Sequence, residues 1–162
     1  MPSSGKSTLG RQLAKRLDYQ FVDTDDLIES QEIASISEIF KYKGEEYFRL
    51  VESKILRGIE ANQKLIVATG GGMPCFHHGM EFIKANGTSI FLNVPPEDLL
   101  KRIHKSDANN RPLINKTTSQ EELLASIKKR YEDRKQFYEK ADIQIDGSID
   151  VDQILWLLEE LT

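Results

Sequence analysis

The residues best suited to chemistry lie at the start of the chain, in positions 3–8. Gly5, Lys6 and Ser7 match the closing half of a phosphate-binding loop, G-x-x-x-x-G-K-[ST]. In such a loop, backbone N–H groups cradle phosphate oxygens, the lysine reaches the outer phosphates, and the hydroxyl holds Mg²⁺. The same three residues could merely start a helix. The residues that follow have a strong helical pattern and then a predicted strand that ends in acidic residues. Both features favour the phosphate loop.

Two carboxylates and a run of glycines follow predicted strands further along the chain. Asp23 and Asp25 come after the apolar segment 19–22, where they could serve as turn or N-cap residues. Next to a phosphate loop, one of them could support Mg²⁺ while the other faces an acceptor hydroxyl. The glycines at 70–72 follow the apolar segment 65–68. Because glycine has no Cβ, this run predicts a place where a substrate approaches the backbone.

Arginines could supply the positive charge that such a site needs. Arg49 falls close to the apolar face of a predicted helix over 45–61, and Arg134 falls in a long helical pattern toward Phe137. Most arginines are surface residues, and that interpretation also fits these two. Arg111 stands beside Pro112 in the polar segment 105–118, which predicts a mobile lid that could carry a cation onto a transferring phosphate.

The elements that would position these residues alternate between strands and helices. Strands are predicted at 19–22, 65–68, 88–94 and 143–146, and helices at 5–17, 26–61, 80–85, from 96 onward, from 118 onward and from 150 to the end. Two predicted helix starts carry capping boxes, Ser35 with Glu38 and Thr118 with Glu121, and Gly44 is a predicted helix stop. The last helix is expected to bury Ile154, Leu155, Trp156 and Leu158. This alternation predicts a parallel α/β sheet in one domain over 1–162.

Composition narrows the possible partners and the compartment. The chain has 162 residues, 39% of them hydrophobic and 30% charged, as in an ordinary globular domain. Its net charge of −4 argues against nucleic-acid and anionic-membrane partners. Its one cysteine, Cys75, cannot form an internal disulfide, and there is no apolar run long enough to span a bilayer. We therefore expect a cytoplasmic enzyme, working as a monomer on small molecules.

Taken together, these motifs resemble the shikimate kinase family, a group of small P-loop kinases. The resemblance covers essentially the whole chain from Pro2 onward. It rests on motifs in the family's order and spacing: Gly5-Lys6-Ser7-Thr8, Phe21-Val22-Asp23-Thr24-Asp25 with Ile28-Glu29, Glu45-Glu46-Tyr47-Phe48-Arg49 with Glu52, Thr69-Gly70-Gly71-Gly72, Arg111-Pro112-Leu113, and Arg134, Tyr138 and Ala141-Asp142. It implies a three-layer α/β/α P-loop kinase fold with a parallel sheet in the order 2-3-1-4-5, a helical substrate-binding segment at about 26–61 and a lid at about 105–118.

The resemblance also implies roles for individual residues. The ATP site would comprise Ser3, Ser4, Gly5, Lys6, Ser7, Thr8 and Arg111. Ser7 and Asp23 would hold Mg²⁺, and the catalytic residues would be Lys6, Asp25 and Arg111. Shikimate would be bound by Asp25, Arg49, Gly70, Gly71, Gly72 and Arg134, with the two arginines holding its carboxylate.

The incomplete phosphate loop leaves other functions open. The first glycine of the motif would fall one position ahead of Met1, and the strand that normally leads into the loop would precede it. We expect that a short apolar strand belonging there is missing from the sequence, because losing a central strand would leave many backbone groups unpaired. The alternatives are a gluconate or nucleoside-monophosphate kinase of the same fold, or a non-catalytic nucleotide-binding domain.

Overall fold

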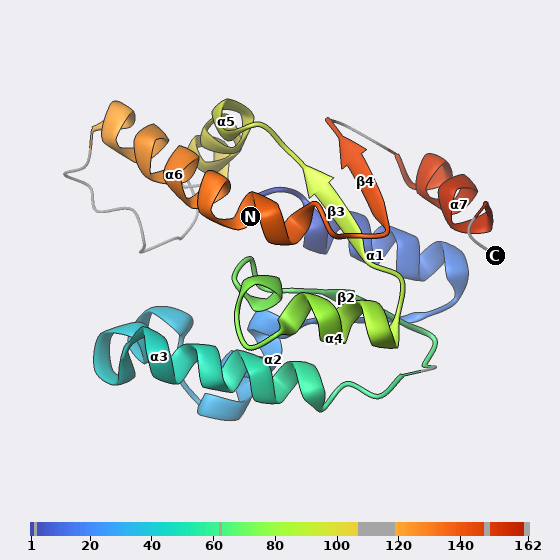
Figure 1. Cartoon of the computed structure of the whole chain (residues 1–162), viewed down its shortest axis with the longest axis horizontal. Coiled ribbons are helices and arrows are strands. Elements are labelled where there is room, and N and C mark those ends of the chain that lie inside the picture. Colours follow the sequence, from blue (N-terminus) through green and yellow to red (C-terminus); the bar gives the residue numbers. More distant parts are fainter. Residues whose placement is uncertain (2, 62, 107–118, 148–149, 161–162) are drawn as a thin grey trace.

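A computed structural model describes residues 1, 3–61, 63–106, 119–147 and 150–160. Helices and strands alternate along the chain (Figure 1). In order they are α1 (Lys6–Leu17), β1 (Gln20–Asp23), α2 (Thr24–Glu32), α3 (Ile36–Arg57), β2 (Leu65–Ala68), the 3₁₀ turn η1 (Met73–Cys75), α4 (Gly79–Asn86), β3 (Ile90–Asn93), α5 (Pro96–Ser106), α6 (Gln120–Tyr138), β4 (Ile143–Asp146) and α7 (Val151–Glu159).

The strands form two parallel pairs. β1 pairs with β2, from Gln20 opposite Leu65 to Asp23 opposite Ala68. β3 pairs with β4, from Ile90 opposite Ile143 to Asn93 opposite Asp146. The predicted α/β organisation with parallel strands is confirmed. Among the described residues β2 and β3 do not pair with each other, and the two pairs match the 2-3 and 4-5 neighbours of the predicted order.

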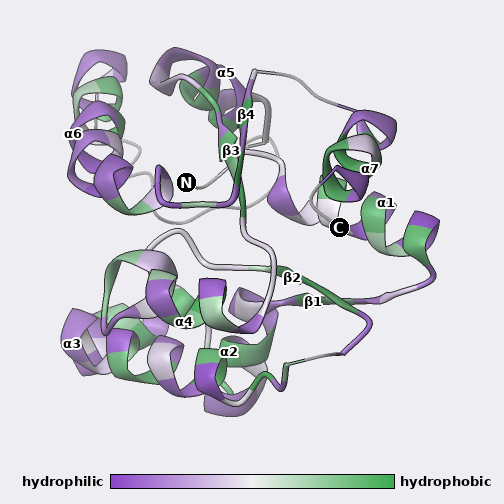
Figure 2. Cartoon of the chain, turned by 45° about the vertical axis from the view of Figure 1, so that its right-hand side comes forward, coloured by the Kyte–Doolittle hydropathy of each residue, from purple (hydrophilic) through white to green (hydrophobic). Residues whose placement is uncertain are grey.

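Helices cover both strand pairs and enclose three apolar clusters. In Figure 1, α5 and α6 lie on one side of the strands, and α2, α3 and α4 lie on the other. Leu13 of α1 packs with Ile143 and Ile145 of β4 and with Ile154 of α7. A second cluster, built around Ile28, joins α2 to α3, and a third joins Met1 to β3, α5 and α6. In Figure 2 the ribbon is hydrophobic along β2, while β1, β4 and the helices contain both hydrophobic and hydrophilic residues.

The ends of the helices follow local side-chain chemistry. The capping box of Ser35 and Glu38 is confirmed at the start of α3. The predicted box of Thr118 and Glu121 is wrong in register: α6 starts one residue later, where Ser119 and Glu122 cap each other. The predicted helix stop at Gly44 is confirmed, because its φ of 80° and ψ of 172° interrupt the helical backbone and divide α3 into two helical parts across a kink.

Two predictions of burial were wrong. Trp156 is 59% exposed, because the core-facing side of α7 is set by Ile154, and a residue two positions further along points away from that side. The all-apolar segment 65–68 was expected to form a buried strand, but Leu65, Ile66 and Val67 are half-buried and only Ala68 of β2 is buried. No helix in the described part of the chain is long and apolar enough to cross a membrane.

Candidate active site

The phosphate-loop residues lie at the N-terminus of α1. Gly5 caps this helix with φ 96°, a left-handed conformation that favours glycine. Lys6 and Ser4 both donate hydrogen bonds to the Met1 carbonyl, each at 3.0 Å. Arg102 of α5 donates to the Ser4 carbonyl at 3.0 Å, which places a further cation beside the loop. The N-terminal end of a helix together with these cations makes a favourable place for phosphate.

Ser7 and Asp23 meet at the foot of this loop. The Ser7 hydroxyl donates to one oxygen of Asp23 at 2.5 Å. The other Asp23 oxygen accepts the backbone N–H of Asp25 at 3.0 Å and so caps α2. The N-cap and functional interpretations of Asp23 are therefore compatible. A hydroxyl and a carboxylate side by side are oxygen ligands of the kind that Mg²⁺ prefers, so this pair fits a magnesium site.

Asp25 is half-buried at the start of α2, directly beyond the Ser7–Asp23 pair. Burial raises the pKa of the Asp25 carboxyl, and the neighbouring Asp23 carboxylate raises it further, while Lys6 opposes both effects. A carboxylate whose pKa is raised in this way is a better proton acceptor than a solvated one.

The three glycines at 70–72 each lie against a different functional side chain. A Cβ on Gly70 would come within 2.8 Å of an Asp25 oxygen and 2.9 Å of a Glu52 oxygen. A Cβ on Gly71 would lie 3.3 Å from the Arg134 guanidinium, and one on Gly72 would overlap that of Arg49. The structure therefore brings the predicted acceptor-site residues together around this segment. A Cβ at position 70 or 72 would collide with one of them, whereas at position 71 the Arg134 side chain would need to move only slightly.

Arg49 is held by two carboxylates on its own helix. It is only 8% exposed, and its Nη1 donates to Glu52 at 2.6 Å. Its Nε and Nη2 both donate to one oxygen of Glu45, at 3.1 and 2.7 Å. The ring of Phe76 lies 4.4 Å from the guanidinium carbon. Sequence reasoning assigned no role to Glu45 or Glu52, although their spacing of i−4 and i+3 from Arg49 puts all three on one helical face.

The C-terminal part of α6 borders the same glycines. Arg134 and Tyr138 lie four residues apart on this helix, and the Tyr138 hydroxyl donates to the Gly71 carbonyl. Burial raises the pKa of Tyr138 to about 12, so its hydroxyl stays protonated as a donor. Of the other predicted residues, Ser3 and Ser4 lie in the loop and Thr8 is exposed on α1. Arg111 and nearly all of the predicted lid lie outside the described residues.

A phosphate loop at a helix start, paired carboxylates after a parallel strand and converging arginines define a P-loop small-molecule kinase. Residues 2–158 match the family model described as shikimate kinase. A shikimate kinase of Clostridium botulinum is 44% identical over 141 residues, which are 87% of this chain and 80% of that protein. The chain belongs to the shikimate kinase family.

Solved structures agree with this assignment. A shikimate kinase structure from Bacteroides thetaiotaomicron superposes with a TM-score of 0.88 at 31% identity, over 99% of this chain and 93% of that one. A shikimate kinase from Acinetobacter baumannii in complex with shikimate gives a TM-score of 0.87 at 30% identity, over 99% and 89%. The kinase is thus one of aromatic amino acid biosynthesis, and the gluconate and nucleoside-monophosphate alternatives are set aside.

Proposed function

We propose that this chain transfers the γ-phosphoryl group of ATP to the 3-hydroxyl of shikimate, with the residues described above in defined roles. The observation that carries the assignment of roles is the convergence of Asp25, Arg49 and Arg134 on the glycines at 70–72. These side chains come from α2, α3 and α6, so the convergence depends on the tertiary fold. An anionic acceptor with a reactive hydroxyl needs this combination of guanidinium groups and a carboxylate.

Residues of α1 and of the adjacent end of β1 would bind ATP and the metal ion. Lys6 and the backbone of the loop would bind the outer phosphates of ATP, and Ser7 with Asp23 would hold Mg²⁺. The metal ion, when bound, neutralises charge on the phosphates. In the ATP-bound enzyme, the Lys6 ammonium would exchange the Met1 carbonyl for phosphate oxygens.

The acceptor side falls to Asp25 and the two arginines. Asp25 would hydrogen-bond the acceptor hydroxyl, align it for in-line attack and take its proton. The Nε–Nη2 edge of Arg49 has the fork geometry that binds a carboxylate, and the partly exposed Glu45 occupies it. A substrate carboxylate would displace Glu45 there, while the buried Glu52 keeps the guanidinium in place. Arg134 would bind the same carboxylate from the side of α6.

Further features of the enzyme are proposed on the sequence and the family. Segment 26–61 would bind the acceptor, and a lid at 105–118 would close over ATP and bring Arg111 onto the transferring phosphoryl group. We further propose that the enzyme uses Mg²⁺ and works as a monomer in the cytoplasm.

ADP release measured with Mg²⁺–ATP and a panel of acceptors tests the proposal. We expect turnover with shikimate and none with gluconate or nucleoside monophosphates. Turnover on one of the other acceptors, without turnover on shikimate, would overturn the assignment. Nucleotide binding without turnover on any acceptor would favour a non-catalytic domain.

A further inference from the structure

Arg130 of α6 is a cation that the proposed function does not use. It lies one helical turn before Arg134, and Tyr138 lies one turn after Arg134. Residues four apart on a helix share one face, and Tyr138 on this face donates to the Gly71 carbonyl. Arg130 therefore extends, by one turn, the side of α6 that borders the glycines at 70–72.

The Arg130 guanidinium makes no hydrogen bond or ion pair within the described part of the chain. Partial burial, and then the charges of Arg134 and Arg49, lower its pKa, while the Glu45 carboxylate raises it. Like charges four residues apart on a helix are unfavourable, so a carboxylate beside Arg130 would stabilise this side of α6. Glu45 of α3 is the carboxylate whose charge acts on Arg130 most strongly.

Glu45 is attached to Arg49 through one oxygen. Both hydrogen bonds from Arg49, at 3.1 and 2.7 Å, end on that oxygen, and the Glu45 side chain is 60% exposed. Glu45 is also the first residue after the kink at Gly44, so it begins the second helical part of α3. An ion pair with such an exposed member contributes little stability, so Glu45 can leave Arg49 at low cost.

A substrate carboxylate must take the same donors of Arg49. The Nη1 atom is bound to the buried Glu52, and the Phe76 ring lies 4.4 Å from the guanidinium carbon. The Nε–Nη2 edge, which Glu45 occupies, is therefore the part of Arg49 that a ligand can take. When a carboxylate binds there, Glu45 loses its cation and is repelled by the ligand. Arg130 is a cation that can receive it.

We propose that Glu45 exchanges its ion pair with Arg49 for one with Arg130 when the acceptor binds. Glu45 fills the Arg49 fork in the empty site, and Arg130 holds it away from the substrate carboxylate in the filled site. Both are positioning residues that set the affinity for the acceptor. An acceptor without a carboxylate leaves Glu45 on Arg49, so the exchange also selects for anionic acceptors. This inference rests on the proposed function, because it needs a carboxylate acceptor at Arg49.

Calorimetric titration with shikimate and steady-state ADP release test the exchange on the full chain. Arg130→Gln should weaken shikimate binding about two- to fivefold and raise the KM similarly, with kcat unchanged, because an exposed ion pair is lost only in the complex. Arg130→Lys keeps the charge and should restore most of the affinity. Lys129→Gln makes the same charge change at the exposed neighbouring position and should bind shikimate like the wild-type chain.

Variants of the acidic partner provide the decisive comparison. Glu45→Gln removes the competitor for Arg49 and should strengthen shikimate binding about two- to fivefold. Glu46→Gln, at the exposed neighbouring position, is the control and should leave binding unchanged. In the Glu45→Gln background, Arg130→Gln should have no more effect than Lys129→Gln, because the ion pair that it would break is already absent.

Three results would overturn the exchange. Equal effects of Arg130→Gln and Lys129→Gln in the wild-type background would mean that Glu45 moves into solvent. Equal effects of Arg130→Gln with and without Glu45 would mean that Arg130 acts on shikimate directly. A crystal structure of the shikimate complex with Glu45 still bound to Arg49 would exclude the exchange outright. Each of these results comes from a chain that binds shikimate, whereas a wild-type chain that neither binds nor phosphorylates shikimate would refute the proposed function and the exchange with it.

Discussion

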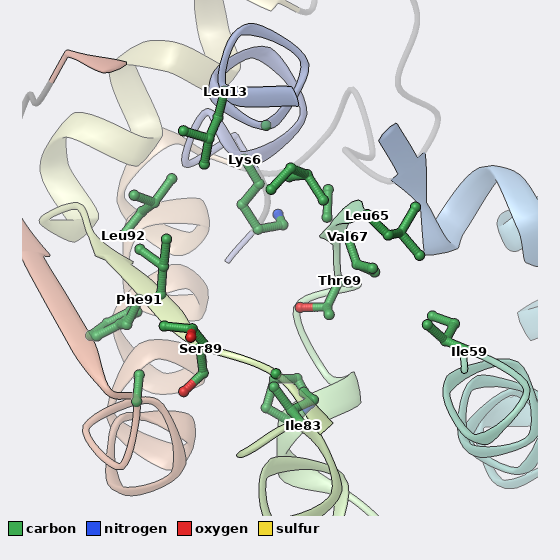
Figure 3. Close-up of a pocket in the computed structure, with 18 of the residues that line it drawn as sticks. Lys6, Leu13, Ile59, Leu65, Val67, Thr69, Ile83, Ser89, Phe91 and Leu92 are labelled. Carbon is green, nitrogen blue, oxygen red and sulfur yellow. The ribbon is translucent and has the colours of Figure 1, made fainter. Parts of the chain in front are cut away.

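The acceptor side of the site and the centre of the strand layer are built in opposite ways. Around the glycines at 70–72, polar groups are buried and paired: Glu52 is 2% exposed and bonded to Arg49, and Thr24 is fully buried and accepts the Gly70 N–H at 2.8 Å. In the strand layer, apolar residues such as Ile66 and Val67 are only half-buried, because they border an apolar cavity (Figure 3).

The three charged side chains of the acceptor site come from helices. Asp25, Arg49 and Arg134 belong to α2, α3 and α6, and none of them lines the apolar cavity of about 640 Å³ between β2 and β3, although Gly70 and Gly71 border both regions. The acceptor site should therefore respond strongly to the loss of single polar groups, and the strand layer weakly to the loss of single apolar groups.

The largest expected effect comes from Asp25→Asn, which keeps the shape of the side chain and removes its capacity to take a proton. We expect turnover with shikimate to fall by about 10²–10⁴-fold, with ATP affinity unchanged, as measured by steady-state kinetics and nucleotide titration. Asp26→Asn, at the exposed neighbouring position, is the control. Weakened ATP binding at normal turnover would show that Asp25 acts on ATP and not on the acceptor hydroxyl.

Arg49→Ala should damage both binding and stability, whereas Arg134→Ala should damage binding alone. Each loses charge-assisted hydrogen bonds to the shikimate carboxylate, worth about 1.5–3 kcal/mol. Arg49→Ala also leaves Glu52 buried without its cation, at a cost of about 3–5 kcal/mol in the free energy of unfolding. Urea unfolding and the KM for shikimate measure the two effects.

A double variant separates these two effects. Adding Glu52→Gln to Arg49→Ala should recover much of the stability, because the buried charge is gone, but none of the affinity for shikimate. If Arg49→Ala and Arg134→Ala had equal free energies of unfolding, the buried Arg49 would contribute no more to stability than the half-buried Arg134.

Truncation of an isoleucine to alanine should lower the free energy of unfolding more on the acceptor side than in the strand layer. Ile28 is fully buried between α2 and α3, and Ile28→Ala should lower the free energy of unfolding by about 2–5 kcal/mol. Ile66→Ala removes the same atoms beside the existing cavity and should cost about 1 kcal/mol, because fewer contacts are lost. Denaturant unfolding of both variants checks this. Equal costs would mean that the centre of the strand layer is as well packed as the acceptor side.

Asp142 fastens the start of β4 to the start of β3. Hydrogen bonds from the Ser89 hydroxyl and N–H, and then from Lys84, lower the pKa of Asp142 from 3.8 to about 2. The stabilisation is therefore complete above pH 3.8 and is lost as the pH falls toward about 2. Asp142→Asn should cost about 1 kcal/mol at neutral pH after solvent screening. The cost should vanish in acid, and a pH-independent difference in unfolding free energy would count against this linkage.

The smallest effect concerns the pH at which activity is lost. Asp25 must be ionised to accept a proton, and its raised pKa places the acid limb of kcat/KM above the pH expected for a solvated aspartate. Asp26 contributes to this rise, so Asp26→Asn should move the limb slightly to lower pH. Pre-steady-state and steady-state rates across the acid range measure the shift, and a shift in the opposite direction would exclude Asp25 as the titrating group.

Local chemistry made much of the fold predictable. The alternation of strands and helices, the capping box at Ser35 and the break at Gly44 depend on residues close in sequence, and the structure has each of them. At the start of α6, Thr118 with Glu121 and Ser119 with Glu122 have the same spacing. Spacing alone could not decide between the two registers. Trp156 shows the other limit, since apolar character did not reveal which side of α7 faces the core.

The site was predictable as a set of residues but not as an arrangement. Residue types and spacing singled out Asp25, Arg49 and Arg134, but their distances to the glycines depend on how α2, α3 and α6 pack. The same holds for the burial of Arg49. Its sequence context suggested a helix face, whereas the burial comes from Phe76 and Glu52 closing over it.

The glycine segment also has a consequence for how the chain tolerates mutation. Because positions 70, 71 and 72 each face a different side chain, neighbouring substitutions should produce different defects. A side chain at 70 disturbs the carboxylate that takes the proton, one at 71 disturbs α6, and one at 72 expels a buried cation. In a saturation-mutagenesis screen, most substitutions at these three positions should reduce activity. Second-site mutations that restore activity should then lie in three different helices, α2, α3 and α6.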